Sequence, residues 1–164
     1  MTKSNTKSKK GFTIIEVVLV LAIAGLIFLM VFVALPALQR SQRDTQRKDD
    51  MGRLITAVQN YQSSNKNKVP NTSNDYISTS NFYTNYLKTD GDSFADPSSN
   101  SDYVFVFKGE CNNDTCTNTE AKTGEITVFT NAICNGDHAT RKEGNGRLAF
   151  LIKLEGATFY CSNN

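Results

Sequence analysis

The hydrophobic and polar positions of this chain fall into regions with different periods, and the first region is almost entirely apolar. Nineteen consecutive residues from Val17 to Leu35 have no charged or polar side chain. The wider apolar stretch, residues 12–38, is long enough as a helix, at ~1.5 Å per residue, to cross a hydrocarbon core of ~30 Å. We expect a membrane-spanning helix there, bent at Pro36, because proline removes a backbone donor and clashes with the preceding turn.

After residue 38 the pattern becomes that of an amphipathic helix. Residues 39–50 are polar on every side, and apolar residues then return at spacings of three and four: Met51, Leu54, Ile55, Val58 and Tyr61. We expect residues 39–64 to continue the first helix. A single helix of that length is unusual in a soluble domain. It is expected if its first half lies in a membrane or a polymer and its second half packs on a domain.

Residues 65–102 are rich in Asn, Ser, Thr and Asp and are punctuated by Pro70 and Pro97. This composition predicts a long surface loop between the helix and the C-terminal third of the chain. A short helix is expected within it at residues 80–87, with Ser80 as its N-cap.

From residue 103 onward the period changes to two. Tyr103, Phe105 and Phe107 alternate with two valines, and residues 125–134, 147–154 and 157–161 have similar patterns. Glu155-Gly156 is suited to a two-residue turn. Three or four antiparallel strands with one apolar face need a cover, which the face of Leu54, Val58 and Tyr61 supplies. The predicted fold class is α+β: a long bent N-terminal helix on a small antiparallel sheet, residues 103–164.

Four cysteines lie beyond the apolar stretch, and their even number there favours disulfides. Free or metal-binding cysteines are the alternative, but a Cys-x4-Cys spacing with one distant histidine is poor zinc spacing. Four cysteines allow three pairings, which the sequence cannot separate. We favour Cys111–Cys116, which closes a short turn, and Cys134–Cys161, which spans the last strands.

The charges exclude some classes of function. The formal charge is +2, but four lysines lie in the first ten residues, and without them 14 basic and 16 acidic residues remain. Nucleic acid is therefore not indicated. The mixed charges between Arg40 and Arg53 are expected to form a solvated helix face. The chain has one histidine, His138, which we place in a loop, and no nucleophilic triad or phosphate loop, so we expect neither an enzyme nor a bound cofactor.

A single carboxylate, Glu16, stands at the head of the apolar stretch. At the centre of a membrane such a group would cost on the order of 2.5–3.5 kcal/mol, and less near an interface. An ionisable group in this position therefore predicts a function and a charged partner.

The sequence KKGFTIIEVVLVLAIAGLI, residues 9–27, resembles the processing site and N-terminal helix of the type IV pilin superfamily, which includes secretion pseudopilins. The likeness extends to about Pro70. It implies that a membrane peptidase removes residues 1–11 by cutting after Gly11 and methylates the new N-terminus, Phe12. It also implies that Glu16 is the assembly residue. Gly25 falls where the family often has glycine, a second expected point of helix distortion, whereas Pro36 lies later than the usual family proline.

The resemblance implies a filament subunit. Glu16 of one copy would pair with the free amine of Phe12 on another, and apolar helices would pack in the filament centre. The expected partners are further copies and related pilins, prepilin peptidase, and an inner-membrane assembly platform with its ATPase. The chain would first span the cytoplasmic membrane with its C-terminal part outside, and later join a surface filament serving adhesion, twitching motility or DNA uptake.

Three alternatives stay open. A pseudopilin of a type II secretion or competence apparatus would make a short filament; calcium in the acidic 90–102 loop (Asp90, Asp92, Asp96, Asp102) would favour it, although we expect a solvated loop there. A membrane-anchored binding domain that never polymerises would tolerate a neutral residue at position 16. A secretory signal peptide cut near residues 34–37 is the third, but the apolar stretch is too long for one.

Overall fold

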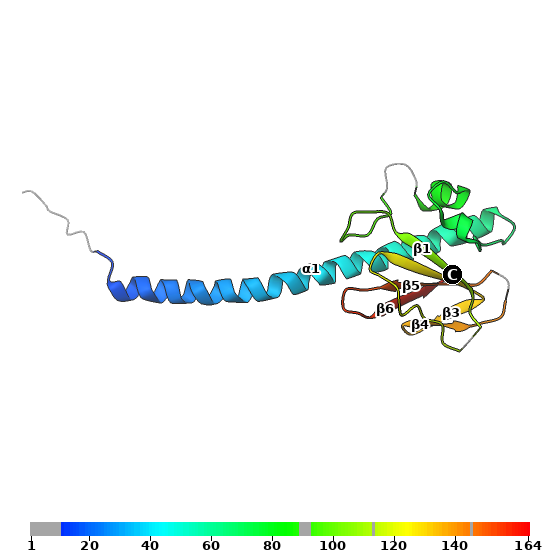
Figure 1. Ribbon diagram of the computed structural model, residues 1–164. Coiled ribbons are helices and arrows are strands. Elements are labelled where there is room, and N and C mark those ends of the chain that lie inside the picture. Colours follow the sequence, from blue (N-terminus) through cyan, green and yellow to red (C-terminus); the bar gives the residue numbers. More distant parts are fainter. Residues whose placement is uncertain (1–10, 89–92, 113, 145) are drawn as a thin grey trace, which may run out of the picture. The chain divides into compact units, whose positions relative to one another are not determined.

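The structure, a computed structural model, describes residues 11–88, 93–112, 114–144 and 146–164 (Figure 1). The described residues form two compact units, one that ends at residue 39 and one that begins at residue 40. Helix α1 (Ile14–Ser64) contributes residues to both units. The long helix that the sequence predicts is therefore present.

In the first unit, the side chains of α1 are almost all apolar and exposed. Pro36 and Gly25 both lie inside the helix. This part of α1 is long and apolar enough to cross a membrane. A helix that is apolar all round needs either lipid or other helices around it.

The second unit contains a four-stranded sheet with the order β1-β2-β5-β6. These strands are β1 (Val104–Glu110), β2 (Glu125–Thr130), β5 (Leu148–Lys153) and β6 (Phe159–Asn163). Strands β2, β5 and β6 pair antiparallel, but β1 pairs parallel with β2. The expectation of a purely antiparallel sheet is therefore wrong at one edge. Residues 111–124 return the chain to the start of β2, as a parallel pair requires and a tight hairpin would not allow.

A second sheet contains only β3 (Ala132–Asn135) and β4 (His138–Arg141). The single strand predicted over residues 125–134 is in fact two, because Asn131 has a φ of 52° and turns the chain between β2 and β3. His138 begins β4, so its placement in a loop is also wrong.

The connection between β5 and β6 is longer than the predicted two-residue turn. It runs from Leu154, whose N–H donates to the Thr158 carbonyl at 2.9 Å, through Ala157, which has a φ of 63°. The backbone N–H of Glu155 donates to Asp44 of α1 at 3.0 Å. This connection is therefore shaped by its contact with the helix.

The main core lies between α1 and one face of the four-stranded sheet. Leu54 and Val58 of α1 pack there with alternate residues of β2 and β5, and the predicted covering face is confirmed. Aromatic residues of the 65–103 segment close the core: Tyr76, Phe82, Tyr83, Phe94 and Tyr103. In its described residues, that segment contains the short helical turns η1 (Ser73–Tyr76) and η2 (Tyr83–Leu87). Ser80 accepts a hydrogen bond from the Tyr83 N–H at 3.1 Å, as its predicted capping role requires.

Candidate functional site

The first turn of α1 places Glu16 against Thr13. The Thr13 backbone N–H and the Thr13 hydroxyl both donate to Glu16 Oε2 at 2.8 Å. The Glu16 N–H in turn donates to Thr13 Oγ1 at 3.4 Å. This is a capping box, in which Thr13 precedes the helix and Glu16 is its third residue. The signal Thr-x-x-Glu stands in the sequence at residues 13–16 and gives Glu16 a partner within its own chain.

The predicted cleavage position lies before the helix. Gly11 and Phe12 precede the first helical residue, and the Phe12 side chain is 90% exposed. The bond between them is therefore outside the hydrogen-bonded part of α1. Glu16 stands one turn further along and is exposed. Gly11, Phe12, Thr13 and Glu16 thus form one short accessible segment at the start of an apolar helix.

Residues 6–32 match the model of the prokaryotic N-terminal methylation motif. The chain carries this motif. It is the class III signal peptide of type IV pilins, and it includes Gly11, Phe12, Glu16 and Gly25. Neither a curated protein nor a solved structure matches the chain.

The motif supports a prepilin of the type IV pilin or pseudopilin kind. It implies a structural subunit rather than an enzyme, processing by prepilin peptidase, and assembly into filaments. The fold agrees with it, since the long apolar helix, the antiparallel-rich sheet and two C-terminal disulfides make an α+β, pilin-like arrangement.

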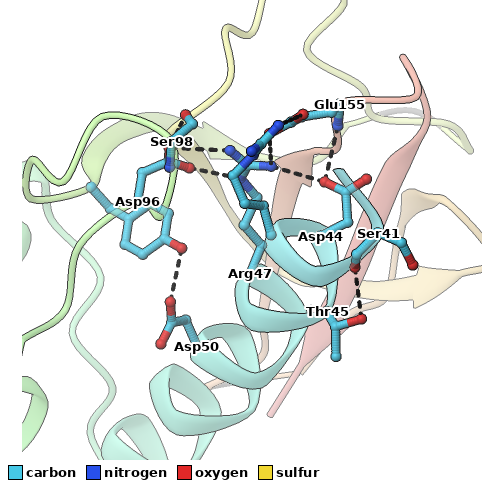
Figure 2. Close-up of polar contacts among 10 residues, drawn as sticks. Ser41, Asp44, Thr45, Arg47, Asp50, Asp96, Ser98 and Glu155 are labelled. Carbon is cyan, nitrogen blue, oxygen red and sulfur yellow. Dashed lines mark hydrogen bonds and ion pairs between the residues drawn. The ribbon is translucent and has the colours of Figure 1, made fainter. Parts of the chain in front are cut away.

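A second polar cluster surrounds Arg47 in the globular unit (Figure 2). The Arg47 side chain has no exposed area and binds Asp96 through two hydrogen bonds, from Nε at 2.7 Å and from Nη2 at 3.1 Å. Its Nη1 donates to Asp44 at 2.9 Å and to Glu155 at 3.2 Å. The prediction of a solvated helix face is wrong here. The mixed charges of residues 40–53 do not by themselves predict that Arg47 is buried against Asp96, which lies 49 residues further along the chain.

Glu155 is shared between two arginines. Besides Arg47 it binds Arg43, whose Nε and Nη2 donate to the two carboxylate oxygens at 2.5 and 2.7 Å. The hydrogen bond from Arg43 is the main reason that the pKa of Glu155 falls to about 2. Burial opposes ionisation of Asp96, but its hydrogen bonds with Arg47 and Ser98 keep the Asp96 pKa below its usual value. Both carboxylates are therefore ionised at neutral pH.

A further buried carboxylate, Asp50, lies one turn along α1 from Arg47. It accepts a hydrogen bond from the Tyr103 hydroxyl at 2.9 Å and another from Arg53 at 3.1 Å. Burial raises the pKa of Asp50. Together, Arg43, Arg47 and Asp50 attach the start of β1, the 94–102 loop and the β5–β6 turn to one side of the helix. These contacts hold the three segments against α1.

In the described part of the acidic 90–102 loop, the aspartates pair with cationic side chains. Asp96 binds Arg47, and Asp102 accepts hydrogen bonds from Lys88 Nζ at 3.0 and 3.1 Å. Asp90 and Asp92 lie outside the described residues. Among the residues that the structure describes, no group of three or more His, Cys, Asp or Glu is placed to hold a metal ion.

The four cysteines form Cys111–Cys116 and Cys134–Cys161, the pairing favoured from the sequence. His138 lies 3.1 Å from its neighbour Asp137, measured from Nδ1 to Oδ1. The disulfides and the histidine lie in the globular unit, whereas the motif of residues 6–32 belongs to the first unit.

Proposed function

We propose that this chain is a pilin, a structural subunit of a type IV pilus-like surface filament, cut after Gly11 and N-methylated at Phe12. The methylation motif at residues 6–32 is the observation that carries the proposal. The apolar surface of residues 12–38 supports it, because so much exposed apolar area requires a bilayer before assembly and neighbouring helices after it.

Cleavage supplies the charge that Glu16 needs. Breaking the Gly11–Phe12 peptide bond turns the Phe12 nitrogen from an amide into a free amine. The hydrogen bonds from Thr13 reach Glu16 Oε2, so Oε1 remains to accept the Phe12 amine of a neighbouring copy. An unpaired charge in an apolar bundle is costly whereas a paired one is tolerated, and this pairing sets the axial register between subunits.

The remaining features fit a subunit that crosses the cytoplasmic membrane first. The lysines before Gly11 favour an N-terminus inside and a globular unit outside. Two disulfides suit an oxidising compartment on the outer side. An assembly platform and ATPase then move the mature chain into the filament, whose use is adhesion, twitching motility or DNA uptake.

The first test is mass spectrometry of the N-terminal peptide in two fractions of the same cells, sheared surface material and membranes. A chain starting at methylated Phe12 in the sheared fraction is the expected result. The same terminus found in membranes and absent from sheared material would instead favour a pseudopilin. An uncut chain, or one starting after residue 37, would overturn the proposal.

The second test separates processing from assembly. Glu16→Ala should be cut and methylated normally yet be lost from the sheared fraction, because the Phe12 amine then has no carboxylate to meet. Glu120→Ala removes an exposed carboxylate of the globular unit and is the matched control, with incorporation unchanged. Recovery of Glu16→Ala in filaments at the wild-type yield would overturn the proposed role of Glu16 in assembly.

A further inference from the structure

The connection between β3 and β4 is a short turn at the surface. Asn135 ends β3 and pairs with His138, the first residue of β4, so that Gly136 and Asp137 form the turn. Gly136 has a φ of 66°, a backbone conformation that favours glycine. Asn135, Gly136 and Asp137 are all exposed. An Asn-Gly dipeptide therefore lies at the accessible tip of this hairpin.

The side chain of Asn135 is not held in place by the described part of the chain. Two other asparagines of the same region are held: Nδ2 of Asn131 donates to Glu110 at 3.0 Å, and Oδ1 of Asn163 accepts from the Cys134 N–H at 3.0 Å. The Asn135 amide has no such partner among the described residues. Its Cγ carbon can therefore turn towards the backbone nitrogen that follows it.

That nitrogen, the backbone nitrogen of Gly136, is equally accessible. In the described chain, no backbone carbonyl accepts a hydrogen bond from the Gly136 N–H. A Cβ added at Gly136 would meet nothing within 4 Å, so no neighbouring segment lies over the residue. Because glycine has no side chain of its own, it permits a close approach to its backbone. Cγ of Asn135 and the nitrogen of Gly136 can therefore meet.

We propose that Asn135–Gly136 is a site of spontaneous covalent modification, at which the asparagine of the folded protein becomes isoaspartate or aspartate. Hydroxide removes the proton of the Gly136 N–H, and the nitrogen attacks Asn135 Cγ. The new N–Cγ bond forms, the Cγ–Nδ2 bond breaks, and Nδ2 takes a proton from water and leaves as ammonia, which regenerates hydroxide. Water then opens the cyclic succinimide. Opening at the main-chain carbonyl gives isoaspartate, and opening at Cγ gives aspartate.

Isoaspartate would change the turn in two ways. It routes the main chain through Cγ and so adds a main-chain carbon between Asn135 and Gly136, in a connection whose length sets the register of β3 with β4. It also adds a negative charge beside the exposed side chain of Asp137, which repels it. The pairing of Asn135 with His138 at the tip should therefore weaken. This modification does not depend on the proposed function.

The test follows the full chain in detergent micelles during a long incubation in neutral buffer made with heavy-oxygen water. Trypsin cuts after Lys122 and Arg141, so a single peptide, residues 123–141, carries both Asn135 and Asn131. Electron-transfer fragmentation of this peptide should show isoaspartate and aspartate at position 135, labelled by the solvent oxygen. Conversion at Asn135 should exceed that at Asn131 at least roughly tenfold, because Ala132 and not glycine follows Asn131.

The oxygen label separates conversion of the folded chain from conversion during digestion. Absence of labelled product at position 135 would overturn the proposal, and so would equal conversion at Asn131. The same incubation in urea shows whether the fold permits the reaction. If the unfolded chain converts at Asn135 and the folded chain does not, the turn protects the asparagine and the proposal is wrong.

A variant assigns the reaction to the neighbouring nitrogen. Gly136→Ala should lower conversion at Asn135 at least roughly fivefold, because the methyl group hinders approach to the backbone. The variant is compared with the wild type in urea as well, where strain at the positive φ of residue 136 has no effect. Unchanged conversion there would overturn the succinimide route. Amide hydrogen exchange of residues 135–138 should be faster in the aged chain than in the fresh one, and equal exchange would contradict the weakened tip.

Discussion

Arg47 and Asp96 face each other through two hydrogen bonds, although 49 residues separate them in the chain. Arg47 belongs to α1, and Asp96 belongs to the loop that leads into the sheet. Both side chains are buried, so each charge depends on the other to offset the loss of water. Burial alone would lower the pKa of Arg47, but its hydrogen bonds with Asp96, Asp44 and Glu155 raise that pKa further above its already high value. The pair therefore stays ionised and holds the loop against the helix.

Arg47→Ala should destabilise the globular unit by about 3–5 kcal/mol, because it leaves the buried carboxylate of Asp96 without a counter-charge. The measurement is urea unfolding of the full chain in micelles followed by tyrosine fluorescence, since all six tyrosines lie between residues 61 and 160. Arg40→Ala, which removes an exposed arginine two turns earlier on the same helix, should change stability by less than about 0.5 kcal/mol. Equal losses in the two variants would show that burial of Arg47 does not matter.

Glu155→Gln should remove part of the acid sensitivity of folding. The pKa of Glu155 is about 2 in the folded chain, below its usual value of 4.5, so its stabilising contribution is fully present above pH 4.5. It is lost as the pH falls from 4.5 towards 2. The stability difference between the wild type and Glu155→Gln should therefore be constant near neutral pH and shrink by roughly half or more in acid.

The same unfolding experiment at a series of pH values checks this. Asp96, whose pKa is also lowered, contributes in the same direction in both chains, and Asp50, whose pKa is raised, contributes in the opposite direction. The Asp50 effect cancels in the difference between variant and wild type, whereas the Asp96 effect cancels only in part, because Asp96 and Glu155 both bind Arg47. A difference that grows on acidification would contradict the assigned pKa of Glu155.

The sequence predicts the long helix, the face formed by Leu54 and Val58, and the alternation of Tyr103, Phe105 and Phe107, because periodicity is a local property. It does not predict the parallel pairing of β1 with β2, since strand direction depends on how a long connection returns. The burial of Arg47 likewise cannot be predicted from the local sequence, because two of its partners, Asp96 and Glu155, lie 49 and 108 residues away. The capping box of Thr13 and Glu16 is different, since Thr-x-x-Glu is a local signal. The charge of Glu16 predicted only a charged partner, and the resemblance to pilins implied that this partner belongs to another copy.

Two glycines should respond in opposite directions to replacement by alanine. Gly124 has a φ of +84°, and an added Cβ would lie 3.5 Å from the Asp96 side chain. Gly124→Ala should therefore cost roughly 1–2 kcal/mol, mainly from the left-handed backbone. Gly52 lies in α1 with nothing within 4 Å of an added Cβ, so Gly52→Ala should gain about 0.5–1 kcal/mol through helix propensity. Urea unfolding of the two variants measures both, and the same sign in both would contradict the backbone argument.

Thr13 tests whether the geometry of Glu16, beyond its charge, matters for assembly, given the proposed function. Thr13→Val keeps the shape of the side chain but removes the hydroxyl that donates to Glu16 Oε2 at 2.8 Å and caps the helix. The first turn should lose about 1 kcal/mol, and the carboxylate should become less well oriented towards a neighbouring amine. We expect a reduced yield of mature chain in sheared filaments, less severe than the loss for Glu16→Ala, because the Thr13 backbone N–H still donates. Thr13→Ser keeps the hydroxyl and should assemble like the wild type. A Thr13→Ser yield as low as that of Thr13→Val would mean that the methyl group, and not the hydrogen bond, is what assembly requires.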